Sequence, residues 1–147
     1  MRVLGIDPGA GGAVVILENE YPIEWIRMPT MKVGSATRVI AQELANFIDQ
    51  ECAHAYVEAT HAMPGQGVVS MFNFGHSCGV VMGVLGAFGI PYTMVQPQSW
   101  KKSAGLIGKD KDAARVRAIE LWPHWKDLWK KGQGQALADA ALIARHG

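Results

Sequence analysis

The amino-acid sequence predicts a single α/β domain, residues 1–147, with a five-stranded mixed sheet: three antiparallel strands, then two parallel strands, flanked by helices. Three observations predict this class. Three short apolar runs near the N-terminus are joined by short links, which indicates an antiparallel meander. Farther along, strand-like and helix-like segments alternate, which indicates parallel strands. The composition, 49% apolar and 18% charged, is typical of a globular domain with a sizeable core.

The first half of the chain supplies three strands and one helix. Residues 3–7 and 13–17 are almost wholly apolar, as expected of central strands, and the turn PGAGG joins them. ENEYP leads to residues 23–28, where a partial alternation of apolar and polar side chains predicts a third strand. Residues 37–51 carry apolar side chains at helical spacing, which predicts an amphipathic helix.

The second half alternates strands and helices. Residues 54–58 predict the fourth strand, and THAMPGQG is typical of a loop because of its Pro and two Gly. Residues 68–88 predict a long apolar helix rich in Gly and Ala, and residues 92–95 the fifth strand. PQSWKKSAG and KDKDAARVRAIELW predict two basic helical segments, and residues 136–145 a closing helix. This order of elements is that of a ribonuclease H-like fold.

Composition also indicates the cellular setting. No apolar run is expected to reach the length of a membrane span, and the N-terminus lacks the pattern of a signal peptide. Cys52 and Cys78 lie in apolar contexts that we expect to be helical, without the spacing of metal ligands. We therefore expect a cytoplasmic protein with reduced core thiols and no membrane partner.

Charge is unevenly distributed along the chain. Residues 1–96 carry 4 Lys and Arg against 8 Asp and Glu, whereas residues 97–147 carry 10 against 5, and the net charge is +1. The C-terminal third could present a basic face to a polyanion, or its lysines could form an ordinary solvated surface. Charge alone leaves both interpretations open.

Two of the expected strands end in a carboxylate. Asp7 and Glu58 each follow a short apolar run and precede a Gly-containing loop. A buried carboxylate is costly unless it is hydrogen-bonded, paired or bound to a cation. If the two strands are neighbours, the carboxylates converge and repel, and a divalent cation would stabilise both. The alternative is that Asp7 only begins an Asp-Pro-Gly turn and Glu58 only caps a loop.

A third acid, Asp139, interrupts the apolar closing helix QALADAALIARHG. The small residues beside it would let this helix approach the sheet closely and bring Asp139 to the other two acids. Three acids so placed could bind two Mg²⁺ or Mn²⁺ ions for phosphodiester hydrolysis, one activating the attacking water and one stabilising the leaving oxygen. The alternative is an exposed Asp on a surface helix.

Five ordered motifs make the chain resemble a RuvC-type Holliday junction resolvase, most closely the small phage and prophage branch. They are GIDPG at 5–9, YVEATHAMPGQGVVSMFNFG at 56–75, VQPQSWKK at 95–102, GKDKDAARVRA at 108–118 and ADAALIARHG at 138–147. The resemblance implies a homodimeric, metal-dependent endonuclease without a nucleotide cofactor. Such an enzyme binds four-way DNA junctions and nicks two opposed strands, leaving 5′-phosphate and 3′-hydroxyl ends. Asp7, Glu58 and Asp139 match the family's metal-binding acids.

The chain departs from this family at one ligand. The family usually has a fourth ligand, Asp or His, three to five residues before the final acid, where this chain has Gly134, Gln135 and Ala136. The carbonyl of Gln135 could coordinate weakly or hold a metal-bound water, and His146 lies about two turns farther along the helix. Either the branch uses another ligand set or catalysis is weakened.

Candidate DNA contacts fall in three segments. The loop after Glu58 offers His61 to stack or contact a phosphate, Met63 as an apolar wedge, and Gln66. The basic helical segments add candidates for phosphate contacts: Ser99, Lys101, Lys102, Lys109, Lys111 and Arg115. An exposed loop histidine and a solvated helix start are the alternatives. Asp110 or Asp112 is expected to cap the second segment.

Other surfaces and functions remain open at this point. The Gly- and Met-rich face of residues 71–88 could form a dimer surface or pack within one subunit, and the three tryptophans of LWPHWKDLW are expected mainly to cover the core. A broad flap or branched-DNA nuclease, or a junction-binding relative with lost catalysis, are alternative functions. GIDPGAGG also resembles the phosphate loop of actin-like sugar kinases, but those need two such domains.

Overall fold

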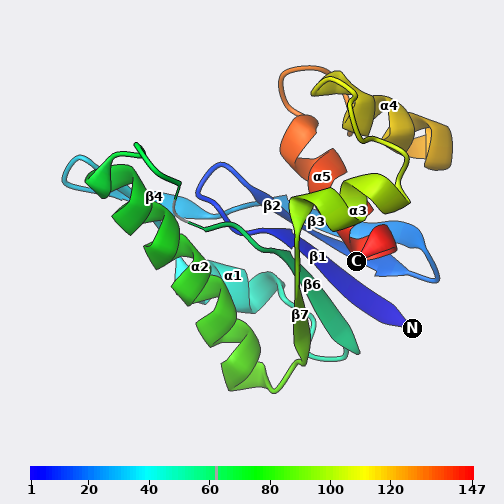
Figure 1. Ribbon diagram of the computed structural model, residues 1–147. Helices are drawn as coiled ribbons and strands as arrows, with labels where there is room; N and C mark the ends of the chain where they lie inside the picture. Colours follow the sequence, from blue (N-terminus) through cyan, green and yellow to red (C-terminus); the bar gives the residue numbers. More distant parts are fainter. Residues whose placement is uncertain (62) are drawn as a thin grey trace.

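A computed structural model describes residues 1–61 and 63–147. Its central sheet has five strands in the order β3-β2-β1-β6-β7 (Figure 1). The strands are β1 (Arg2–Asp7), β2 (Ala13–Glu18), β3 (Tyr21–Arg27), β6 (His54–Glu58) and β7 (Tyr92–Val95). β1, β2 and β3 pair antiparallel, whereas β1 with β6 and β6 with β7 pair parallel. The predicted fold class is confirmed.

Helices cover both faces of the sheet, and each face has its own hydrophobic core. α1 (Ala41–Phe47) and α2 (Val68–Phe88) lie on one face (Figure 1). The other face carries α3 (Pro97–Ser103), α4 (Asp112–Leu121), the short 3-10 helix η1 (Pro123–Trp125) and α5 (Gln135–His146). Alternate side chains of β1 and β2 point into opposite cores, which explains why both strands are almost wholly apolar.

The structure corrects the helix predicted at residues 37–51. Its first residues belong to a separate hairpin of β4 (Thr30–Val33) and β5 (Ala36–Val39), and α1 occupies only Ala41–Phe47. Val39 reaches the core from a strand, so the apolar residues that indicated a helix come from two elements. Cys52 is therefore not helical but buried in the segment before β6, and Cys78 lies on α2; both are free thiols.

The expectation that no apolar run reaches the length of a membrane span is wrong for α2. Its 21 residues are long and apolar enough to cross a membrane by length and composition alone, and 17% of its most apolar stretch is buried. α2 packs on the sheet through Val81, Val84 and Leu85, while much of its remaining apolar surface faces outward.

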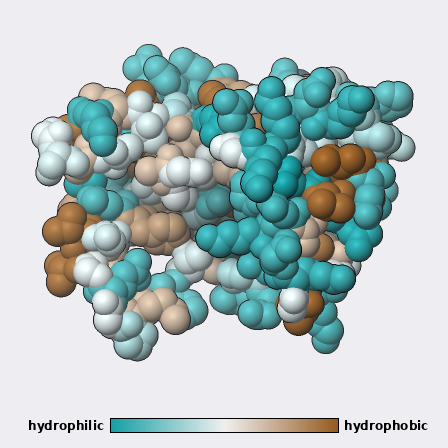
Figure 2. All heavy atoms as spheres, turned by 90° about the horizontal axis from the view of Figure 1, so that it is seen from above, coloured by the Kyte–Doolittle hydropathy of each residue, from teal (hydrophilic) through white to brown (hydrophobic). Residues whose placement is uncertain are grey.

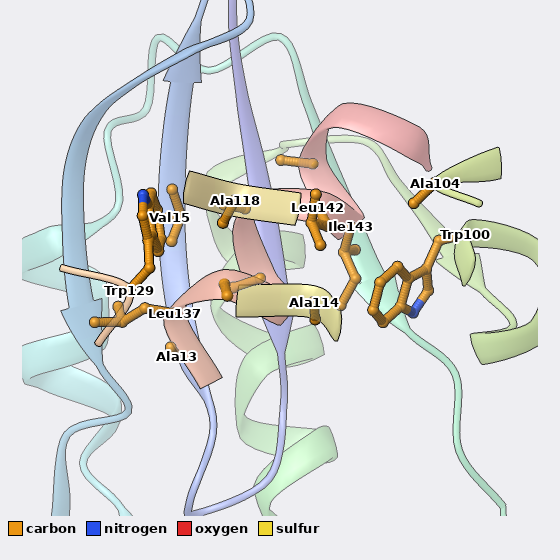
Figure 3. Packing of buried hydrophobic residues seen from close by; sticks show 14 of the residues in the cluster. Ala13, Val15, Trp100, Ala104, Ala114, Ala118, Trp129, Leu137, Leu142 and Ile143 are labelled. Atoms are coloured by element: carbon orange, nitrogen blue, oxygen red, sulfur yellow. The ribbon is translucent and has the colours of Figure 1, made fainter. Parts of the chain in front are cut away.

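The tryptophans after α4 mainly cover the core, as the sequence predicts. Trp122 and Trp129 are buried against α5, with ring centroids 5.6 Å apart. Trp125 is partly exposed and packs edge-on against Trp25 of β3. Figure 3 shows Trp129 beside Val15 and Leu137, so this segment closes the end of the core between β2 and α5.

α5 lies unusually close to the central strand β1. A Cβ added at Gly5 of β1 would lie 1.9 Å from the carbonyl oxygen of Ala140 and 2.7 Å from Cβ of Ala144. Gly5 and the alanines of α5 therefore permit direct contact between helix and strand backbones. This contact confirms the expectation that small residues bring α5 against the sheet.

Substituting Gly5 with Ala should consequently destabilise the protein. We expect Gly5→Ala to lower the free energy of unfolding by about 3 kcal/mol, because the new methyl group must displace α5. Gly86→Ala is the matched control, since Gly86 lies in α2 with no atom near its added Cβ. It should stabilise by about 0.5–1 kcal/mol through helix propensity. Urea denaturation measures both, and equal effects would contradict the close contact.

Candidate active site

Asp7 and Glu58 end neighbouring parallel strands. The register pairs Ile6 of β1 with Val57 of β6, so the residues that follow them reach the same edge of the sheet. After Asp7 the chain turns tightly, with the backbone N–H of Gly12 donating to the carbonyl of Gly9 (2.9 Å). A Cβ at Gly12 would lie 2.0 Å from the Asp7 carbonyl oxygen, so the turn requires glycine there. The sequence prediction of adjacent strands is confirmed.

Asp139 approaches the same edge from α5. It is partly buried and lies between Ala138 and Ala140, both of which are fully buried. The helix is anchored against β1 at Gly5, two residues before Asp7, which holds Asp139 near the end of that strand. The alternative of an exposed surface aspartate is therefore excluded.

The three acids interact electrostatically. Burial and then the charge of Glu58 raise the pKa of Asp7, a backbone hydrogen bond from Gly9 opposes them, and the resulting pKa is about 6. The pKa of Asp139 is likewise raised to about 7, mainly by burial and next by the charge of Asp7. The neighbouring carboxylates thus make ionisation of Asp7 and Asp139 less favourable, and without a cation the pair is partly protonated near neutral pH.

Two neutral side chains donate hydrogen bonds to these acids. The indole Nε1–H of Trp100 donates to Oε2 of Glu58 (2.7 Å), and the amide Nε2–H of Gln135 donates to Oδ1 of Asp139 (3.0 Å). Trp100 is buried on α3, directly after β7. The sequence interpretation missed its role, because only the pairing of β6 with β7 brings it to Glu58.

The carboxylate oxygens of Asp7, Glu58 and Asp139 are chemically suited to a hard divalent cation, although these side chains do not form a closed ligand shell. Across the described residues, no group of three or more His, Cys, Asp and Glu side chains is arranged to hold a metal ion. The three acids supply oxygen donors, which Mg²⁺ and Mn²⁺ prefer. None of the ion pairs formed by the described residues includes any of the three. Repelling carboxylates without a cationic partner are the expected state of such a site before an ion binds.

The structure also shows what stands at the position of the usual fourth ligand. Gln135 begins α5 and directs its amide N–H to Asp139, while Gly134 precedes the helix and Ala136 offers no ligating atom. His146 hydrogen-bonds to Ser103 at the far end of α5 (3.0 Å). Gln135 therefore contacts the acids as a hydrogen-bond donor, and His146 does not reach them.

A hollow lies between the loop after Glu58 and α2. Its volume is about 700 Å³, and its lining includes His61, Met63, Gln66 and Phe74. The side chain of Gln66 accepts a hydrogen bond from the backbone N–H of Met63, which shapes the loop, and both His61 and Met63 are exposed. Phe74 lies next to Gly9, so the hollow adjoins the turn that follows Asp7.

A second hollow, of about 390 Å³, is lined in part by Asp139. Lys101, Lys109 and Lys111 line it together with Asp139 and Gln135. We call it the lysine cleft. Figure 2 shows hydrophilic side chains gathered on the right-hand half of the molecule, over α3, α4 and α5. The structure thus brings the basic segments to one side of the acids.

The remaining basic and polar candidates lie farther from the acids or have other partners. Ser99 and Lys102 are exposed on α3 and do not line the lysine cleft. Arg115 is largely buried and donates to Asp112 and to the carbonyl of Trp129, so its guanidinium group already has partners within the protein. Asp110, just before α4, accepts a hydrogen bond from the N–H of Ala113, whereas the N-cap residue is Lys111, which makes no side-chain cap, and Asp112 is the first residue of the helix.

Comparison with solved structures identifies the fold. Over 98% of its length the chain superposes on RuvC from Thermus thermophilus, at 16% identity, with a TM-score of 0.58 and 91% of that protein covered. A structure of T. thermophilus RuvC in complex with a Holliday junction substrate gives a TM-score of 0.68 at 17% identity, covering 98% of this chain and 90% of that one. The chain has the fold of RuvC.

Sequence comparison finds a curated relative that is named as a Holliday junction resolvase. The chloroplastic Holliday junction resolvase MOC1 of Chlamydomonas reinhardtii is 32% identical over 92 residues, which is 62% of this chain and 10% of that protein. The chain thus spans about a tenth of the length of this curated relative. No family model matches the chain.

The raised pKa values predict how stability depends on pH in the absence of metal. Because both folded-state values lie above the ordinary 3.8, the folded protein binds more protons than the unfolded chain between about pH 4 and 7. The free energy of unfolding should therefore fall as pH rises through this window. Asp7→Asn removes one repelling charge and should stabilise the metal-free protein by about 2–3 kcal/mol at pH 8, with almost no gain at pH 4.

Thermal unfolding in EDTA at the two pH values measures this effect. Asp127→Asn is a control that removes an exposed carboxylate from the segment after η1. It should change stability little at either pH. If Asp7→Asn were destabilising at pH 8, the repulsion between the acids would be refuted.

Proposed function

We propose that this chain is a RuvC-type endonuclease that binds four-way DNA junctions and resolves them by paired nicks, leaving 5′-phosphate and 3′-hydroxyl ends. The observation that carries the proposal is the group of three repelling carboxylates beside the lysine cleft, on a fold shared with RuvC. The proposal includes two Mg²⁺ or Mn²⁺ ions at Asp7, Glu58 and Asp139. The sequence motifs favour the phage and prophage branch of the family.

In this mechanism the carboxylates bind the cations and the lysines bind the phosphates. Bound divalent ions would supply activation of water and neutralisation of charge on the phosphodiester. Trp100 and Gln135 each donate to one carboxylate, which fixes the direction in which Glu58 and Asp139 present their remaining lone pairs. Lys101 lies close enough to Asp139 to lower its pKa slightly, so its ammonium also reaches the region where a phosphate would lie.

DNA would occupy both hollows. The lysine cleft offers three cations to the backbone without reading sequence. In the other hollow, His61 and Met63 project from an exposed loop above apolar walls, which suits insertion between base steps at the branch point. Ser99 and Lys102 would add contacts along the outer surface of α3, whereas Arg115 is held inside the fold.

Paired nicks require two active sites, and α2 offers a surface for a second copy of the chain. Val68, Val69, Phe72 and Met82 of this helix are exposed. Figure 2 shows hydrophobic residues at the left-hand edge, the side on which α2 lies in Figure 1. Burial of this apolar surface in a homodimer would remove it from water. It would explain why so long and apolar a helix lies at the surface of one subunit.

The direct test is incubation of the purified protein with a labelled four-way junction, a flap and a linear duplex. With Mg²⁺ or Mn²⁺ we expect symmetric nicks in the junction, ends that T4 ligase can seal, and little cleavage of the duplex. Glu58→Gln should abolish cleavage while leaving junction binding intact, since binding depends on the lysines. Binding without cleavage in either metal would contradict the endonuclease, and equal cleavage of flap and junction would contradict junction specificity.

Removal of lysine charge should weaken binding in a salt-dependent way. For the double variant Lys101→Ala, Lys109→Ala we expect weaker junction binding and a slope of log affinity against log salt lower by about 1.8, since each lost phosphate contact removes about 0.9. The matched control is Lys126→Ala, Lys130→Ala, which removes two lysines from the segment before α5 and outside the cleft. Equal slopes for the two double variants, measured by fluorescence anisotropy, would place the DNA elsewhere.

A further inference from the structure

Glu58 receives a hydrogen bond from a tryptophan that the expected ligand set does not include. The indole Nε1–H of Trp100 lies 2.7 Å from Oε2 of Glu58, while the two residues are 42 positions apart in sequence. Trp100 is 1% exposed and packs in the core between the sheet and α5. Figure 3 shows its ring beside Ile143. A side chain held by its core contacts is a rigid donor.

The direction of this hydrogen bond matters for a carboxylate that binds a cation. An indole N–H is a neutral group that only donates, so it contacts the carboxylate without bringing a charge that would compete with a cation. It occupies one lone pair of Oε2 and fixes the rotation of the carboxyl group, which would otherwise turn freely in a partly exposed position. Side chains that orient metal ligands in this way are typically worth about 10–100-fold in metal affinity.

The other buried tryptophans serve as internal comparison. The indole N–H of Trp122 donates to the backbone carbonyl of Glu20 (2.9 Å), and that of Trp129 to the backbone carbonyl of Trp122 (3.4 Å). Both rings fill the core, and neither indole N–H donates to Asp7, Glu58 or Asp139. Among these three buried tryptophans, Trp100 therefore combines a core position with a contact to the candidate site.

We propose that Trp100 is a positioning residue for the metal site: its indole N–H holds the Glu58 carboxylate in the orientation that binds a divalent cation. This inference rests on the proposed function, because it assumes a cation at Asp7, Glu58 and Asp139. The same indole ring lies under the ammonium of Lys101, 5.6 Å from the ring centroid. Trp100 thus links the carboxylate side of the site to the lysine cleft.

The test compares Trp100→Phe with Trp122→Phe. Each variant keeps an aromatic ring, loses one indole N–H and leaves a small cavity in the same core cluster, so both should lose some thermal stability. The affinity for Mg²⁺ or Mn²⁺ is measured by isothermal titration calorimetry without DNA. Trp100→Phe should bind the ion about 10-fold more weakly than the unaltered protein, and Trp122→Phe should bind it with unchanged affinity. Equal affinities in the two variants, or tighter binding by Trp100→Phe, would overturn the proposal.

A spectroscopic readout on the unaltered protein avoids dependence on the folding of a variant. In ¹H–¹⁵N spectra, assigned through backbone correlations, Mg²⁺ should shift the indole cross-peak of Trp100 and leave those of Trp122 and Trp129 in place. A Trp100 peak that stays fixed while the amides of residues 7 and 139 shift would overturn the positioning role alone. If no peak shifts at all, the metal site itself is refuted, and the proposed function with it.

Discussion

The close contact between α5 and β1 is the constraint on which the site depends. The side chains between a helix and a sheet normally keep the two backbones apart. Gly5 and the alanines of α5 are small enough to let the helix and strand backbones touch. Asp139 is thereby held at the same sheet edge as Asp7 and Glu58, which are already neighbours by strand register. Larger residues at the contact would separate the helix from the strand and the third acid from the other two.

This arrangement places three like charges in a partly desolvated space, which opposes folding. The raised pKa values of Asp7 and Asp139 express that opposition, since burial and neighbouring charge shift both groups toward the protonated form. The surrounding residues reduce it with neutral donors, Trp100 and Gln135, rather than with salt bridges. A neutral donor stabilises a carboxylate without occupying the place of a cation, so the charge remains available for binding.

Much of the fold and the three acids could be predicted from the sequence because each signal is local. Asp7 and Glu58 end apolar runs, and Asp139 interrupts an apolar helix among alanines. Other features depend on distant partners and have no such signal. The contact of Trp100 with Glu58 arises from strand pairing, and the internal partners of Arg115 include a carbonyl 14 residues away. The end of β5 was predicted as part of a helix because Val39 continues the apolar spacing of α1.

Proton release on metal binding tests the central claim most directly, namely that the three acids repel one another until a divalent cation joins them. At about pH 6.5 Asp7 and Asp139 are partly protonated, since their pKa values are about 6 and 7, so bound metal must displace protons. Addition of Mg²⁺ or Mn²⁺ to the unbuffered protein should acidify the solution measurably at this pH and hardly at all near pH 9. The variant Asp7→Asn, Asp139→Asn should release none. Metal binding by the unaltered protein at pH 6.5 without proton release would contradict the account.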